Sequence, residues 1–234
     1  EIERSIMKNY KRDSQKKNNY DLRKLTLELI VVFLGVTVGF LLNNWRIQNQ
    51  EKSLEQKYLN GFAQNIKINN TSLQTAIETD SLRIENMKPM ILILQSGELP
   101  ADSVISVFQN IISISRLEFH TDTYQEIINS GNLNIINDFQ LKEKIVNYHI
   151  SIDGVKFVED YFHNYHSTFV LPFVLNEFNM LTGELNNLDI IKTVKFSNMI
   201  ASYYSLLQQQ LNVYKELLVK SIDLRQIIES SLSK

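Results

Sequence analysis

The chain has 234 residues, with 24 Lys or Arg against 26 Asp or Glu, a formal net charge of −2, and no cysteine. The lack of cysteine excludes a disulfide framework, a thiolate metal site and a thiol nucleophile within this sequence. Charge is spread unevenly: residues 1–24 hold eight basic and four acidic side chains, whereas residues 47–234 hold 15 basic and 21 acidic ones, net −6. Residues 47–234 are thus acidic and contain no patch of basic residues interleaved with aromatic ones. Such a segment binds nucleic acid poorly, so no nucleic-acid partner is expected.

An apolar run at residues 25–45 is the strongest pattern in the chain. Eighteen residues, 25–42, form a helix of about 27 Å, close to the hydrocarbon thickness of roughly 30 Å. Trp45 follows, where an indole suits a membrane–water interface. The uncharged core, residues 29–42, is short enough for a buried helix or a signal-peptide core, but it lacks a polar face and no cleavage site follows. We therefore predict a transmembrane helix at residues 25–45.

Basic residues predict the orientation of this helix. Eight Lys or Arg precede the run, whereas Arg46, Lys52 and Lys57 alone follow it over a similar length. Positive residues stay on the cytoplasmic side of a membrane. Residues 1–24 are therefore expected to be a basic cytoplasmic segment that touches lipid, and residues 46–234 an extracytoplasmic domain of a single-pass membrane protein.

Three residues of the run carry possible function. Glu28 is its one ionisable side chain, and an intramembrane acid is a candidate for a transport or coupling role. It also lies one turn after Lys24, at the N-terminal end of the helix dipole, where pairing or headgroup contact explains it equally well. Gly35 and Gly39 form a small-xxx-small motif, which permits close contact between membrane helices but also occurs by chance.

The rest of the chain predicts an all-α fold. Only three prolines occur, and five of the seven glycines follow the run; such scarce punctuation favours long helices. Asp122 is expected to cap a short helix that Gly131 ends, Pro172 to bend or break a long one, and residues 176–189 to form the most loop-like segment. The expected helices cover residues 25–95 (the membrane helix continuing into a long helix), 102–116, 122–129, a long helix that Asn137 or Asp138 opens and that runs to residue 169, and 197–230.

Heptad-like apolar spacing predicts that these helices pack into a bundle or coiled coil. In the first helix the seam includes Leu54, Tyr58, Phe62 and Ile66, and Asn69 and Asp80 interrupt it at seam positions. In the last helix the seam is expected to pass through Tyr204, Leu207, Leu211, Tyr214 and Leu218, then to shift to Ile222 and Ile227 or Ile228, as a stutter would make it do.

One cluster of candidate metal ligands stands out. Glu159, His163 and His166 lie at i, i+4 and i+7, on one face of a helix. Helical di-iron sites use two Glu-x-x-His motifs and two more carboxylates, but here a single Asp160-x-x-His163 occurs among aromatic residues typical of core-flanking packing. With no nucleophile motif and no phosphate-binding glycine loop, we expect no catalytic residue, no cofactor and no enzymatic activity, and keep the His-based metal site as a weak alternative.

Two stretches resemble a known family. Gly35 and Gly39 with the exit Asn43-Asn44-Trp45 are similar to the start of an uncharacterised family of bacterial membrane-anchored helical proteins. Residues 123–138, reading TYQEIINSGNLNIIND and continuing to Tyr148, resemble the family stretch in which a tyrosine-led short helix ends at Ser-Gly-Asn-Leu and a second helix begins. The resemblance covers about fifty residues and implies a bacterial inner-membrane anchor with a periplasmic body. It supplies no catalytic residues, and the family's basic N-terminal segment is usually shorter.

These features lead to two functional hypotheses. The first is a non-enzymatic scaffold or accessory subunit, which forms a homo-oligomer or joins an inner-membrane or periplasmic assembly. The second is a periplasmic ligand-sensing bundle that signals through a partner, with a pocket lined by a cluster of aromatic residues: Tyr161, Phe162, Tyr165, Phe169 and Phe173.

Overall fold

The computed structural model describes residues 2–96, 108–182 and 184–233. It divides into two units, Glu1–Leu54 and Glu55–Lys234. Helices make up almost all of the regular structure in the described residues, so the predicted all-α class is confirmed.

The first unit is the part of helix α1 up to Leu54; the full range of α1 is Ile2–Ser96. From Arg23 to Ser53 nearly all described side chains of this part are exposed, and the large apolar ones of residues 25–45 are 51–70% exposed. The Thr37 hydroxyl donates a hydrogen bond to the carbonyl of Phe33, at 2.8 Å, so this polar group is satisfied within the helix. By length and composition this helix could cross a membrane.

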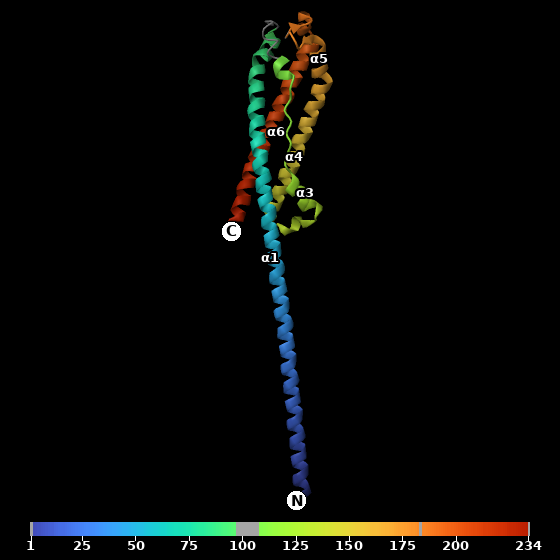
Figure 1. Ribbon diagram of the computed structural model, residues 1–234, viewed down its shortest axis with the longest axis vertical. Coiled ribbons are helices and arrows are strands. Elements are labelled where there is room, and N and C mark those ends of the chain that lie inside the picture. Colours follow the sequence, from blue (N-terminus) through green and yellow to red (C-terminus); the bar gives the residue numbers. More distant parts are fainter. Residues whose placement is uncertain (1, 97–107, 183, 234) are drawn as a thin grey trace. The chain divides into compact units, whose positions relative to one another are not determined.

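The second unit is built around three long helices: the part of α1 from Glu55 onward, α4 (Phe139–Tyr165) and α6 (Val194–Leu232). Figure 1 shows α4 and α6 running beside each other along this part of α1. Their apolar faces form one core, which contains side chains from every long helix, including Met87, Phe162, Phe196 and Tyr203. The helical seam predicted for α1 is confirmed at Tyr58, Phe62, Ile66, Leu73, Ile84 and Met87, all buried.

Short elements connect the long helices. Helix α3 (Asp122–Asn129) has the bounds predicted, and Gly131, at φ 70°, takes the left-handed conformation expected where it ends. The predicted cap at Asp122 is wrong, because Thr121 occupies the N-cap position and Asp122 lies in the first turn. The 3₁₀ turn η1 (Asn132–Ile135) follows, and Asp138 then caps α4 by accepting hydrogen bonds from the N–H groups of Gln140 and Leu141.

Pro172 interrupts the α-helical ladder without ending the helical run. α4 passes into the π-helical turn η2 (His166–Val170) and then into α5 (Leu171–Glu177), with Pro172 in the first turn of α5. A proline there removes an N–H that a continuing α-helix would use. The wider π turn just before it changes the hydrogen-bond register at the same place.

The segment predicted as loop, residues 176–189, contains a small hairpin. Strands β1 (Phe178–Asn179) and β2 (Glu184–Leu185) pair antiparallel, Phe178 opposite Leu185. The 3₁₀ turn η3 (Leu188–Lys192) then leads into α6, which Thr193 caps at the N–H of Phe196.

The helix predicted at residues 102–116 is wrong over its second half. Residues 102–107 lie outside the described residues; residues 108–111 are helical, and residues 113–121 have no regular secondary structure. Ile and Ser alternate from Ile112 to Ser115, a period of two that fits an extended chain better than a helix. This extended backbone is held by side chains of the surrounding helices, as shown below.

The stutter predicted in α6 is also wrong. From Tyr203 onward the buried seam runs through Tyr203, Leu207, Gln210, Tyr214, Leu217, Ser221, Leu224 and Ile228, and the predicted Leu211 is buried beside it. This seam keeps a regular alternation of three and four residues along the helix, as a heptad requires. The prediction counted apolar residues only and so missed Gln210 and Ser221, which occupy seam positions.

The left-handed glycine gives a prediction with a matched control. Gly131→Ala is expected to lower the stability of the bundle by about 1–2 kcal/mol, because a Cβ disfavours this conformation even though the space around it is open. Gly154→Ala, in α4 and equally uncrowded, is expected to raise stability by about 0.5–1 kcal/mol. Chemical unfolding of the full chain in one detergent, followed by circular dichroism, measures both; equal signs would contradict the assignment.

Candidate functional site

The polar centre of the bundle is organised around residues 112–121, here called the extended segment. It runs along the helices in Figure 1 and contacts all three of them through the hydrogen bonds given below. An extended chain cannot satisfy its own backbone N–H and C=O groups, and burying them unpaired is costly. Partners must therefore come from neighbouring side chains.

Helix α1 supplies the first set of partners. Asn69 makes a two-sided contact with the backbone of His120: its Oδ1 accepts from the His120 N–H at 2.8 Å, and its Nδ2 donates to the His120 carbonyl at 3.1 Å. About three turns further along the same helix, Asp80 accepts a hydrogen bond from the Ser115 hydroxyl at 2.9 Å. Arg83 donates to the Ser113 hydroxyl at 3.2 Å and lies 3.4 Å from Asp80. The polar residues that interrupt the α1 seam thus form hydrogen bonds to the extended segment.

Helix α4 contacts the backbone of the extended segment, and the π turn η2 contacts the backbone of the residue just before it. Glu159 accepts from the Leu117 N–H at 2.9 Å, and the same oxygen accepts from the Tyr214 hydroxyl at 2.5 Å. The Nε2 atom of His166 lies 2.9 Å from the carbonyl of Ile111, to which it can donate. Glu159 and His166 are both buried.

Helix α6 completes the set. Gln210 donates through Nε2 to Asp80 at 3.0 Å and to the Ser115 carbonyl at 3.3 Å. The Tyr203 hydroxyl lies 3.3 and 3.2 Å from the carbonyls of Asn110 and Ser113. Sequence reasoning singled out neither Gln210 nor Tyr203 for this role. Their place in the sequence could have identified them, because both lie at core positions of the heptad in α6.

Burial shifts the pKa values of this cluster. It raises the pKa of the Asp80 carboxyl, an effect that hydrogen bonds from Ser115 and Gln210 and the charge of Arg83 oppose. It also raises the pKa of Glu159, against the hydrogen bonds from Tyr214 and Leu117. Burial lowers the pKa of His166, which favours the neutral ring beside Ile111.

A second imidazole is packed as an aromatic ring. His149 stacks on Tyr124 with ring centroids 3.8 Å apart, which attaches α3 to α4. Burial, with a smaller contribution from Lys156, lowers the pKa of His149 to about 4. The ring is therefore neutral near pH 7 and acts as packing.

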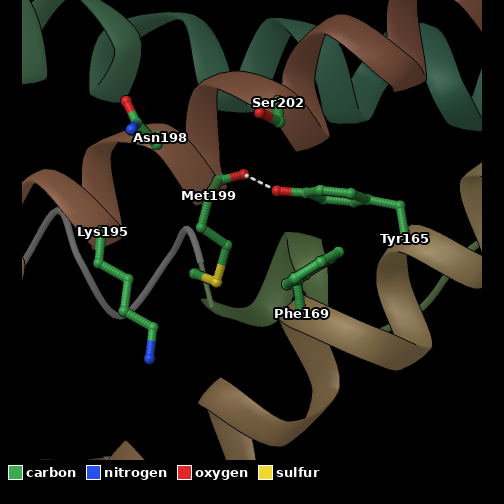
Figure 2. A pocket seen from close by; sticks show the side chains of 6 residues that line it. All are labelled: Tyr165, Phe169, Lys195, Asn198, Met199 and Ser202. Carbon is green, nitrogen blue, oxygen red and sulfur yellow. Dashed lines mark hydrogen bonds between the residues drawn. The ribbon is translucent and has the colours of Figure 1, made fainter.

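A surface groove lies between α6 and the end of α4 with the π turn η2 that follows it. It encloses about 290 Å³ and is lined by Tyr165 and Phe169 on one side and by Lys195, Asn198, Met199 and Ser202 of α6 on the other. Figure 2 shows the Tyr165 hydroxyl donating to the Met199 carbonyl, 3.1 Å away, so the ring forms a fixed wall. Of the predicted aromatic cluster, Phe162 and Phe173 lie in the core instead, and Tyr161 is exposed.

The structure separates the candidate metal ligands. His163 is exposed, whereas Glu159 and His166 are buried and each holds a different backbone group of residues 111–117. Across the described side chains, no three His, Cys, Asp or Glu residues gather as a metal site. The geometry therefore gives Glu159 and His166 structural roles.

The candidates within the apolar run lie on an open surface of the first unit. Gly35 and Gly39 are exposed, with no atom within 4 Å of the position that a Cβ would take. Glu28 is exposed as well. Their assignment as a helix contact and an intramembrane acid stays a prediction.

Comparisons of the chain with protein-family models, curated proteins and solved structures find no significant match. The resemblance to the membrane-anchored family therefore also stays a prediction.

Asn69 offers a direct test of how the extended segment is held. Asn69→Ala leaves the His120 N–H and C=O without partners and is expected to lower the free energy of unfolding by about 2 kcal/mol. Asn60→Ala is the matched control on the same helix, because Asn60 is exposed and, within the described part of the chain, donates only to the Gln56 carbonyl one turn earlier. Urea unfolding of both variants makes the comparison; equal losses would show that Asn69 does not hold the segment.

Glu159 predicts a pH dependence. A carboxyl whose pKa is raised on folding binds its proton more tightly in the folded state, so its contribution to stability falls as pH rises from 4.5 through the folded pKa. Glu159→Gln keeps an oxygen for Leu117 and Tyr214 without a buried charge, and should flatten this fall. Glu159→Ala orphans both donors and should cost about 2–3 kcal/mol. Unfolding measured at pH 5 and pH 7.5 separates them; an unchanged pH slope in the glutamine variant would refute the interpretation.

Proposed function

We propose that the protein is a membrane-anchored, non-enzymatic helical scaffold or accessory subunit of a bacterial inner-membrane or periplasmic assembly. The observation that carries the proposal is the exposed apolar surface of residues 25–45. Burying such a surface is worth roughly 25 cal/mol for each Å² removed from water, so the helix requires lipid or protein around it. Lipid and either a second copy or another membrane protein are the proposed partners.

The charge asymmetry of the sequence supports the proposed orientation. Residues 1–24 stay in the cytoplasm and the bundle lies in the periplasm, following the excess of Lys and Arg before the apolar run. The role of the bundle in this proposal is mechanical. Its buried acids and histidines hold the extended segment or pack against rings, which supports a structural body better than a catalytic one.

Cysteine labelling tests the topology, since the chain has no cysteine of its own. Ser233→Cys, at an exposed position, is expected to react with a membrane-impermeant maleimide once the outer membrane alone is permeabilised, whereas Ser14→Cys should react only after the inner membrane is lysed. Val32→Arg is a control on the anchor. A charge in the middle of the span costs about 3 kcal/mol of insertion free energy, so this variant should move from the alkali-resistant membrane fraction to the soluble fraction. Labelling in the reverse order would overturn the orientation.

Partner capture tests the scaffold itself. Crosslinking in native membranes is expected to trap either a homo-oligomer or a defined membrane partner. Gly35→Leu with Gly39→Leu should weaken the capture if these glycines form the contact. A lone monomer in detergent together with no crosslinked species in cells would refute the scaffold proposal.

The groove of Figure 2 favours ligand sensing as a second candidate function. Two helices that both contribute to the core form its walls, so a bound molecule could bias how α4 packs on α6. Signalling would then need a partner to carry it across the membrane.

A further inference from the structure

We propose that the groove between α4 and α6 binds a small amphipathic anion, an aryl or short acyl carboxylate. This deepens the second candidate function and rests on it. It does not depend on the scaffold proposal, because binding is measured on the protein alone.

The floor and walls of the groove select an apolar body. The Tyr165 and Phe169 rings lie with their centroids 5.3 Å apart at a tilt of 39°, so they present two differently oriented aromatic surfaces. Met199 adds its thioether, a polarisable group that packs well against rings. Phe169 is 58% exposed, so its ring is accessible to a bound molecule.

The rim of the groove selects a negative charge. Lys195 and Asn198 are exposed on α6, and neither side chain has a hydrogen-bond or ion-pair partner among the described residues. Lys192, one turn earlier, is by contrast paired with Asp189 at 2.8 Å. Figure 2 shows the Lys195 side chain extending from the α6 side of the groove, whereas the Asn198 amide points away from the Lys195 ammonium. The ammonium is therefore the group that can hold a carboxylate by a charge-assisted hydrogen bond.

The dimensions fit a small ligand. A volume of about 290 Å³ lies at the lower end of the roughly 300–1,000 Å³ typical of small-molecule sites. The groove is open on one side, so a ligand with one apolar end and one charged end can keep its charge near water.

The test uses the full chain in lipid nanodiscs and two fluorinated probes, 4-fluorophenylacetate and its neutral amide. Fluorine NMR line broadening is measured against empty nanodiscs, which accounts for partition into lipid. The carboxylate is expected to bind saturably. Lys195→Gln should weaken its binding about five- to tenfold, the value of one hydrogen bond at an open site, and affect the amide less than about twofold.

Two further variants complete the experiment. Phe169→Ala should weaken both probes, and Lys215→Gln, an exposed lysine elsewhere on α6, should change neither. Circular dichroism of each variant confirms that the bundle is folded. The proposal is overturned if the wild-type protein gives no saturable broadening beyond empty nanodiscs, or if the two lysine variants bind the carboxylate equally.

Discussion

The second unit depends on one constraint: an extended backbone lies among three helices and must find hydrogen-bond partners there. From Ser113 to His120 the backbone has neither a helix nor a strand ladder to satisfy its polar groups. The helices provide side chains instead, with Asn69 from α1, Glu159 from α4 and Gln210 from α6 each bonding a backbone group of the segment. Because buried polar groups are costly when unpaired, these contacts fix both the register of the segment and the spacing of the helices.

This constraint also determines what remains available for function. Buried ion pairs and acids add little net stability. Removing one partner, however, leaves the other buried and unpaired, which costs several kcal/mol of stability, roughly 3–5. Such a network therefore favours a single arrangement of the bundle. The buried acids and imidazoles are used internally. Two outward-facing surfaces carry our proposals for anchoring and ligand binding: the apolar helix of residues 25–45 and the groove beside Tyr165.

Sequence patterns predicted the helices well where the spacing was apolar and the ends had strong signals, as at Gly131 and Asp138. They failed where polar residues replaced apolar ones inside the core. In α6, Gln210 broke the apolar count, and a stutter was inferred that does not exist. For residues 112–116 the helix prediction failed because partners more than thirty positions away in the sequence, such as Asp80 and Gln210, stabilise the extended form. The groove depends on how α4 packs on α6, which local patterns do not encode.

Amide hydrogen exchange within the extended segment tests this account most directly. The Leu117 and His120 N–H groups are bonded to Glu159 and Asn69, whereas those of Arg116 and Glu118 have no partner among the described residues. We predict slow exchange at Leu117 and His120 and fast exchange at Arg116 and Glu118, measured residue by residue by NMR. Uniformly fast exchange across these four amides would contradict the claim that helix side chains hold the segment in place.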